Sequence, residues 1–318
     1  MENLYLKKYK PKYFNNFYID KDIIQLLKTL IEIDNLNILF IGDSGVGKTS
    51  IIEATIREYY GIDNIFHPDI LFINSLKEQG IQYYRNNLKT FCQTKCSIDT
   101  KKKKFIILDD IDMINEQSQQ VFRNYIDKYS HNVNFLISCV NNQKVIDNIQ
   151  SRTTIIRIKK VTNTDFKKIF KKIKKKENIL IDEEGEQFLY KICNNSINKL
   201  TNYLQKIKLY NKKTDIVTVK NICTNISFFI FEKYTTLWME KNYTESIKLI
   251  MEIYKRGYSV LDILDNYFSF IKIKNMIDEE KKYKIIKFIC KYIENFYTKH
   301  EDEIELSFFT NNLIINLY

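Results

Sequence analysis

The 318 residues of this chain are enough for two or three domains of about 150 residues, each able to bury a core. With 28% charged residues and no apolar run near the roughly 18 residues of a spanning helix, the chain is neither a disordered tail nor a membrane protein. The net charge of +11 favours a polyanionic partner, nucleic acid first and an anionic membrane surface second, although a composition rich in Lys, Asn and Ile explains part of it.

Glycine and proline are scarce, with 7 and 2 residues respectively. A β-sandwich or barrel needs many turn residues, so this scarcity favours long helices. The six cysteines are spread along the chain and the first residues show no signal-peptide pattern. We therefore expect a reduced, intracellular protein.

Strand and helix patterns alternate over the first 160 residues. After an aromatic and basic segment at 1–20, helical spacing of apolar residues predicts a helix over 21–33. Short apolar runs predict buried strands at 36–41, 70–74, 105–108, 134–139 and 155–158. Helices are expected between these strands, at 50–60, 80–91 and 117–129. This alternation predicts a doubly wound parallel α/β sheet.

The strand pattern fades after about residue 160, while helical periodicity continues to residue 318. We therefore predict three domains, an α/β domain over residues 1–160, a small helical domain over 161–222 and an all-α domain over 223–318.

The strongest local motif is the segment from Gly42 to Thr49, which fits the pattern G-x-x-x-x-G-K-[ST] between a predicted strand and a predicted helix. Backbone N–H groups in such a loop form an anion-binding concavity, and the helix N-terminus adds positive potential. Lys48 would reach the β- and γ-phosphates, and the Thr49 hydroxyl would bind Mg²⁺. The predicted nucleotide-binding residues are Gly42, Asp43, Ser44, Gly45, Val46, Gly47, Lys48, Thr49 and Ser50.

A second motif supplies the carboxylates that such a site needs. Four apolar residues, 105–108, precede Asp109 and Asp110 at the end of a predicted strand. Asp109 would hold the metal through its water shell, and Asp110 stands where a base would polarise the attacking water. Asp is about 1 Å shorter than Glu, and displacements of that size can cost about 10²-fold in rate, so hydrolysis is expected to be slow. Asp112 is expected to be a solvated acid at the start of a helix.

Taken together, these motifs resemble those of the small subunits of replication factor C, the clamp loader of the AAA+ ATPase family. The resemblance extends over nearly the whole chain. The segments that carry it are L-K-K-Y-K-P-K (6–12), N-S-L-K-E-Q-G-I (74–81), S-Q-Q-V-F-R (118–123), F-L-I-S-C (135–139), I-Q-S-R-T (149–153) and G-Y-S-V-L-D-I (257–263).

The resemblance implies an AAA+ nucleotide-binding domain, a helical lid and a C-terminal collar, through which five subunits form an open ring. It implies ATP and Mg²⁺ as cofactors and, as partners, the other clamp-loader subunits of a hetero-pentamer, a sliding clamp and primer–template DNA. No membrane partner is implied.

Single residues receive roles from the same resemblance. Arg152 would be the arginine finger that reaches the γ-phosphate held by a neighbouring subunit, acting in trans. Lys10 falls in the N-terminal motif of the nucleotide site. The sensor asparagine of the family aligns with Val140, so a slip of one residue would assign its role to Asn141. The lid arginine aligns with Asn198. Together with Asp110, these departures suggest a subunit that binds ATP, hydrolyses it poorly and still serves its neighbour.

DNA contacts in this family come from helix N-termini that line the ring. Ile81 opens one such helix, and Arg85 and Lys89 follow it on one face. Contacts of this kind would be independent of DNA sequence and sensitive to salt. Gln119 or Gln120 would couple the DNA to the metal carboxylates.

Two other functions remain open at this point. The chain could be another AAA+ replication ATPase, of the origin- or helicase-loading kind, or a scaffold subunit whose ATP is structural. A small-molecule kinase is disfavoured because a helical extension of 160 residues replaces the acceptor pocket. The composition and divergent motifs suggest a large DNA virus as the source, with the nucleus or a cytoplasmic virus factory as the place of action.

Overall fold

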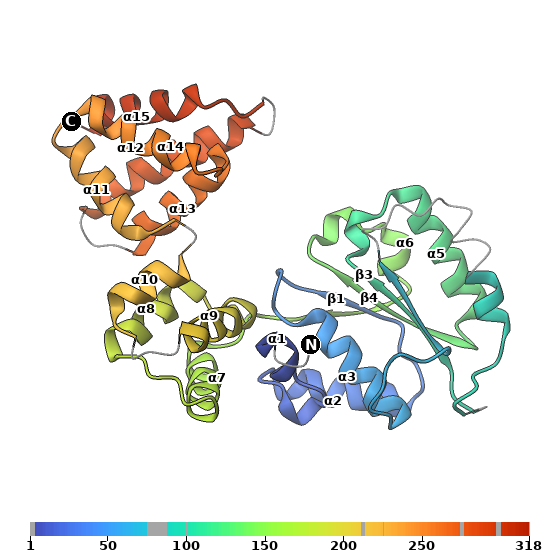
Figure 1. Ribbon diagram of the computed structural model, residues 1–318. Coiled ribbons are helices and arrows are strands. Elements are labelled where there is room, and N and C mark those ends of the chain that lie inside the picture. The colour runs from blue at the N-terminus through green and yellow to red at the C-terminus, as the bar shows by residue number, and fades with distance from the viewer. Residues whose placement is uncertain are drawn as a thin grey trace. The chain divides into compact units, whose positions relative to one another are not determined.

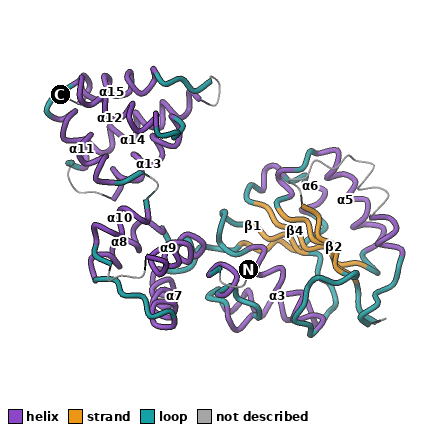
Figure 2. The backbone as a smooth tube through the Cα atoms, viewed as in Figure 1, coloured by secondary structure: helices purple, strands orange, loops and turns teal. Residues whose placement is uncertain are grey.

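The computed structural model describes residues 4–74, 88–99, 101–210, 214–224, 226–273, 277–296 and 300–317. The chain divides into two compact units. The first, here called the α/β unit, comprises Met1–Ile169 and Asn195–Thr201, and the second, the helical unit, comprises Phe170–Asn194 and Asn202–Tyr318. Figure 2 shows strands in one unit and helices alone in the other. The division into three domains stays a prediction.

Five parallel strands form a single sheet in the α/β unit, in the order β2-β3-β4-β1-β5. They are β1 (Ile38–Ile41), β2 (Ile70–Asn74), β3 (Lys104–Asp109), β4 (Val133–Cys139) and β5 (Thr154–Arg157). The predicted parallel sheet and its five strands are confirmed. Because β1 lies between β4 and β5, the strand order reverses beside it, and the carboxyl ends of β1, β3 and β4 meet at one edge, where ligands bind in open α/β sheets.

Helices cover both faces of this sheet, as Figure 1 shows. Side chains of a strand alternate between the faces, so β1 places Phe40 against the layer of α2 and α3, and Leu39 against the layer of α5 and α6. Burial on both faces explains why the strands are continuous apolar runs. The helical segments are α1 (Tyr5–Lys8), η1 (Phe14–Asn16), α2 (Lys21–Glu32), α3 (Lys48–Tyr60), η2 (Ile111–Met113), α5 (Glu116–Tyr129), η3 (Asn142–Lys144) and α6 (Asp147–Gln150). The helix predicted over 80–91 lies mostly outside the described residues, although residues 88–93 are helical.

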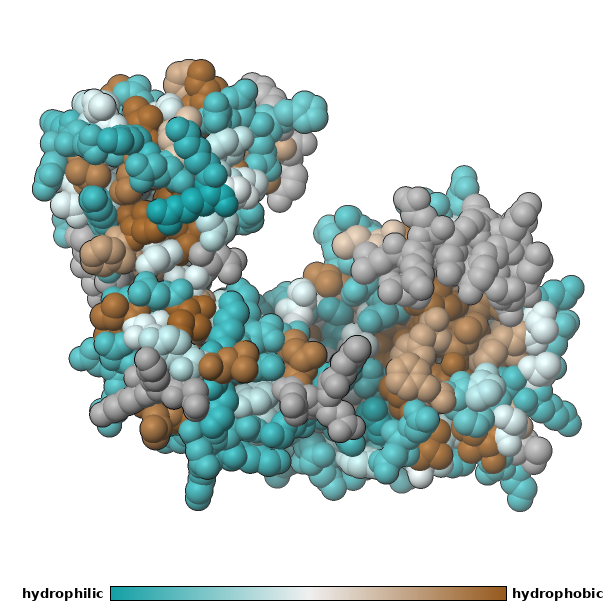
Figure 3. Space-filling model, in the orientation of Figure 1, coloured by the Kyte–Doolittle hydropathy of each residue, from teal (hydrophilic) through white to brown (hydrophobic). Residues whose placement is uncertain are grey.

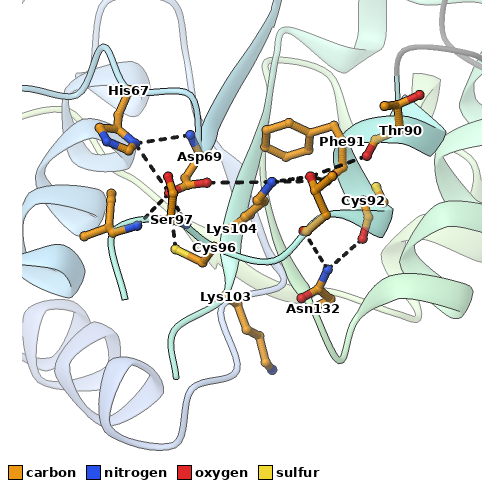
Figure 4. A network of polar contacts seen from close by, with 12 residues as sticks. His67, Asp69, Thr90, Phe91, Cys92, Cys96, Ser97, Lys103, Lys104 and Asn132 are labelled. Carbon is orange, nitrogen blue, oxygen red and sulfur yellow. Dashed lines mark hydrogen bonds and ion pairs between the residues drawn. The ribbon is translucent and has the colours of Figure 1, made fainter. Parts of the chain in front are cut away.

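A buried polar network closes the amino-terminal ends of β2 and β3 (Figure 4). Asp69, only 2% exposed, accepts hydrogen bonds from the N–H groups of Ser97 (2.7 Å) and Ile98 (2.9 Å). Its other oxygen lies 3.7 Å from the ammonium of Lys104, which is 4% exposed and sits 4.7 Å from the ring centre of Phe91. Burial opposes ionisation of Asp69, but hydrogen bonds from Ser97 and Ile98 outweigh it and lower the pKa of this carboxyl below its usual value.

The residues after 160 form helices, as predicted. They are α7 (Asn163–Lys176), α8 (Glu183–Cys193), α9 (Ile197–Tyr210), α10 (Ile216–Cys223), α11 (Phe228–Met239), α12 (Tyr243–Lys255), α13 (Val260–Ile273), α14 (Glu279–Phe296) and α15 (Ile304–Leu317). An aromatic cluster joins α11, α13 and α15, in which the Trp238 indole N–H donates to the Tyr267 hydroxyl at 3.0 Å. Tyr234 pairs likewise with Thr310 at 2.8 Å. Trp238 is therefore a core residue.

Hydrophilic side chains cover most of the face seen in Figure 3, with apolar groups in smaller patches. Among the residues that the structure describes, no helix has the length and apolar character needed to cross a membrane.

Candidate nucleotide-binding site

A cavity of about 580 Å³ opens within the α/β unit at the carboxyl ends of β1 and β3. Its walls are residues 44–50, parts of the N-terminal segment 6–19, the residues that follow β3 and β4, and the first turn of α9. All of these segments belong to the α/β unit. The cavity therefore combines the predicted phosphate loop and carboxylate strand, 60 residues apart in sequence, in one site.

The loop from Gly42 to Gly47 bends around this cavity because glycine occupies its strained positions. Gly45 and Gly47 have φ angles of 78° and 101°, a region that side chains with a Cβ rarely adopt. At Gly42 a Cβ atom would lie only 2.6 Å from the carbonyl oxygen of Ile158. The 13-residue helix α3 then begins at Lys48, so its N-terminus adjoins the cavity. This arrangement favours bound anions.

Lys48 lies folded against the loop. Its ammonium donates to the carbonyl oxygens of Gly42 (2.9 Å) and Asp43 (3.3 Å), and its side chain is buried. The Asp43 carboxylate instead pairs with Lys160 at 3.2 Å, and both groups are exposed. Neither Gly42 nor Asp43 lines the cavity, whereas residues 44–50 all do.

Three oxygen-bearing side chains meet where β3 and β4 end. The Thr49 hydroxyl donates to Asp109 Oδ2 at 3.0 Å, and the Ser138 hydroxyl donates to Asp109 Oδ1 at 2.5 Å. Ser138 also accepts from the N–H of Asp110 at 2.9 Å. Ser138 is fully buried on β4 and was not predicted as a site residue, although a serine inside an apolar strand was a signal.

These oxygens fit Mg²⁺. A hydroxyl and a carboxylate are hard donors, and Mg²⁺ is commonly held by one or two carboxylates together with substrate phosphates and water. Among the described residues, no group of three His, Cys, Asp or Glu side chains could hold a metal on its own. The donor set of Thr49 and Asp109 therefore suits a metal that arrives with phosphates.

Asp110 lines the cavity directly after Asp109. Its φ of 54° is left-handed, which is unusual for a residue other than glycine and costs about 1–3 kcal/mol. Burial is the main cause that raises the pKa of this carboxyl, and the charges of Asp109 and Asp112 add to it, while Lys48 opposes them. The group accepts a proton more readily than an ordinary aspartate does.

Asp112 differs from the solvated acid that we expected. Its Oδ2 accepts from the N–H groups of Val140 (3.1 Å) and Asn141 (2.9 Å), across 28 and 29 residues of sequence. Its Oδ1 is buried and has no hydrogen-bond partner among the described residues. The carboxylate therefore ties η2 to the loop that follows β4, and both Asp112 and Val140 line the cavity.

The remaining predicted nucleotide contacts lie in different places. Asn198 lines the cavity, and its amide nitrogen is 3.6 Å from the position that a Cβ of Gly45 would take. Lys10 also lines the cavity, and it pairs at 2.6 Å with Glu53, a buried carboxylate on α3 that the sequence analysis missed. Asn141 is not a lining residue, and its side chain accepts from the N–H of Gln143 at 2.9 Å.

Arg152 lies two residues after the end of α6 and does not line the cavity of its own chain. Of the predicted DNA residues, Ile81 and Arg85 lie outside the described part of the chain, whereas Lys89 is exposed beside α5. Gln119 is buried, and its amide donates to the carbonyl of Lys144 at 2.9 Å and accepts from the N–H of Ile146 at 3.0 Å. It thus connects α5 with the loop between η3 and α6.

Comparison with known proteins agrees with this architecture. The family model of the ATPase family associated with various cellular activities (AAA) matches residues 38–161, and that of the replication factor C C-terminal domain matches residues 231–295. A DNA polymerase III gamma subunit-related protein of Thermotoga maritima shares the fold with a TM-score of 0.58 at 12% identity, over 92% of this chain and 99% of that one. The fold, the phosphate loop and these matches define an AAA+ ATPase.

The sequence relatives include replication factor C small subunits. A protein of Acanthamoeba polyphaga mimivirus, provisionally assigned as a replication factor C small subunit, is 28% identical over 86% of this chain and 84% of its own length. The replication factor C small subunit of Sulfolobus acidocaldarius is 31% identical over 67% of this chain and 65% of its own. The chain therefore combines an AAA domain with a replication factor C C-terminal domain, and it is similar to curated replication factor C small subunits.

Proposed function

We propose that this chain is one subunit of a hetero-pentameric sliding-clamp loader. It binds ATP with Mg²⁺ and, together with its neighbours, opens the DNA polymerase clamp and loads it onto primer–template DNA. One observation carries the proposal, namely that a nucleotide cavity of the AAA type and a replication factor C C-terminal domain occur in the same chain. The net charge of +11 and the exposed Lys89 are consistent with a DNA partner.

Different residues of the cavity would bind the phosphates, hold the metal and orient the attacking water. N–H groups of the loop 44–50 and the N-terminus of α3 would bind the phosphates, and Lys48 would exchange its two carbonyl partners for phosphate oxygens. Thr49 and Asp109 would hold Mg²⁺, which supplies charge neutralisation on the phosphates when bound. Ser138 holds Asp109 in place, and Asp110 would orient the attacking water and accept its proton.

Hydrolysis at this site should be slow. Asp110 is shorter than the glutamate of the family, and Val140, which has no polar group, lines the cavity where the family has its sensor asparagine. Asn198 stands against the phosphate loop in the place of the lid arginine. Arg152 would act on the nucleotide of the next subunit. The lining position of Val140 also favours a second candidate, a scaffold subunit whose bound ATP is structural.

Affinity capture from the native source in the presence of ATP, followed by mass spectrometry, tests this proposal. Recovery of other AAA+ subunits and a sliding clamp is the expected result. Recovery of the chain alone, or with a helicase, would refute clamp loading and favour an origin- or helicase-loading ATPase. Imaging of the tagged chain would test the expected site of action, the nucleus or a cytoplasmic virus factory.

A further inference from the structure

The guanidinium of Arg152 is held by three hydrogen bonds, although the residue lies on the surface. Nε donates to Asp127 Oδ1 at 2.5 Å, and Nη1 donates to the carbonyl of Asn148 (2.9 Å) and to the hydroxyl of Ser151 (3.2 Å). An arginine has five N–H donors. These bonds use Nε and Nη1, and among the described residues Nη2 makes none.

Asp127 is shared between two arginines. Its Oδ1 receives Arg152 from the end of α6, while its Oδ2 lies 3.3 Å from Nε of Arg123, one turn earlier on α5. One carboxylate therefore joins two basic side chains from separate elements. Arg123 lies four residues before Asp127 on the same helix and contributes charge attraction, since its Nε makes no hydrogen bond in the described part of the chain.

We propose that Asp127 is a positioning residue that holds Arg152 ready for the γ-phosphate of the nucleotide bound by the neighbouring subunit. The inference rests on the proposed function, which assigns Arg152 as an arginine finger. A free arginine side chain samples many rotamers, and their loss on docking opposes the contact. Three hydrogen bonds already fix Nε and Nη1 before docking, so less side-chain entropy is lost when the contact forms. The two N–H groups of Nη2 stay available for the phosphate.

A competing effect has the opposite sign. If Asp127 only neutralised Arg152, its removal would increase the positive potential at the finger and strengthen the contact with a phosphate. Positioning predicts a slower reaction without the carboxylate, whereas competition predicts a faster one. The direction of the change therefore separates the two.

The test uses the complex reconstituted with the partner subunits that are captured with this chain. Single-turnover and steady-state ATP hydrolysis are compared for Asp127→Ala, Asp127→Asn and Arg152→Ala. Glu116→Gln, at an exposed acid on the same helix, is the matched control. We expect Arg152→Ala to reduce the rate at the neighbouring site about 10³-fold or more. Asp127→Ala should reduce kcat about 10- to 100-fold with little change in KM, as expected for a misplaced group.

Asp127→Asn should lose less than Asp127→Ala, because its amide oxygen can still accept from Nε. The double variant Asp127→Ala with Arg152→Ala should match Arg152→Ala alone, a result that general destabilisation would not produce. If Arg152→Ala leaves hydrolysis unchanged, the finger assignment fails and the inference fails with it. If Arg152→Ala is inactive while Asp127→Ala equals or exceeds the wild type, positioning by Asp127 is refuted and the proposed function stands.

Discussion

Replacement of Asp69 by alanine isolates a buried charge in the α/β unit. Lys104, which is 4% exposed, would lose the carboxylate that lies 3.7 Å from its ammonium, its only ion-pair partner among the described residues. The N–H groups of Ser97 and Ile98 would lose their acceptor at the same time. Of its contacts with described residues, the ammonium would retain the Thr94 hydroxyl, the carbonyl of Phe91 and the face of that ring.

Removal of one partner from a buried ion pair costs about 3–5 kcal/mol, because the remaining charge is uncompensated. Two lost hydrogen bonds to a charged acceptor, at about 1.5–3 kcal/mol each, give an estimate of the same size. We therefore expect Asp69→Ala to lower the free energy of unfolding of the α/β unit by about 3–5 kcal/mol. The double variant Asp69→Asn with Lys104→Met should recover much of this loss, since a buried pair can often be replaced by neutral groups.

The pH dependence of this effect has a defined sign. The pKa of Asp69 is lowered in the folded state, so its contribution to stability is complete above the usual pKa of a carboxyl group. That contribution is lost as the pH falls through the lower, folded-state pKa. The difference in stability between the wild type and Asp69→Asn should therefore be largest near neutral pH and shrink in acid.

Urea unfolding followed by far-UV circular dichroism measures this change. Trp238, the single tryptophan, is buried in the helical unit, so its emission reports that unit separately. Glu32→Gln, at an exposed acid on α2, is the control and should unfold like the wild type. A decrease below about 1 kcal/mol in the free energy of unfolding for Asp69→Ala would contradict the proposed role of the network. A shift seen only in the Trp238 transition, which reports the helical unit, would contradict it as well.

Four further predictions concern the nucleotide site. Lys48→Ala should weaken binding of a fluorescent ATP analogue at least about 10-fold without loss of helix content, and unchanged affinity would refute the phosphate-loop assignment. Ser138→Ala leaves the partly buried N–H of Asp110 without its acceptor, so we expect a loss of about 1 kcal/mol in stability and a weaker dependence of nucleotide affinity on Mg²⁺. Because the pKa of Asp110 is raised, ATP hydrolysis should fall on acidification at a higher pH than an ordinary aspartate would give, and Asp110→Asn should abolish that dependence. The triple variant Asp110→Glu, Val140→Asn and Asn198→Arg should raise kcat, and an unchanged rate would show that these residues do not limit hydrolysis.

The sheet and the phosphate loop could be predicted because their signals are local. Each strand is a short apolar run, and the parallel arrangement follows from the alternation with helices. Glycines are rare in this chain, so three of them within residues 42–47 mark a bend in the backbone. Asp109 directly follows such a strand and therefore had to lie at the carboxyl edge of the sheet.

Other site contacts could not be predicted because they join residues far apart in sequence. Ser138 meets Asp109 across 29 residues, and Lys10 meets Glu53 across 43. Side chains of these types are usually solvated, and apart from the position of Ser138 inside an apolar strand, nothing local distinguishes them. The assignment of the sensor role to Asn141 assumed a shift of one residue in the alignment. Whether that shift is correct depended on the path of the chain after β4, where Val140 is the residue that lines the cavity.

The two ends of the sheet hold charge in different ways, and this difference bears on function. At the amino end, Asp69 and Lys104 satisfy each other and their neighbours, so the site has little capacity for a ligand. At the carboxyl end, Asp110 has a left-handed backbone, and the ammonium of Lys48 donates, within the described part of the chain, only to loop carbonyls. Strain and weakly satisfied charges are typical of sites that a ligand completes. ATP should therefore stabilise the carboxyl end selectively, and slower hydrogen exchange in residues 42–50 and 109–112, with no change at 67–73, is the pattern that this argument requires.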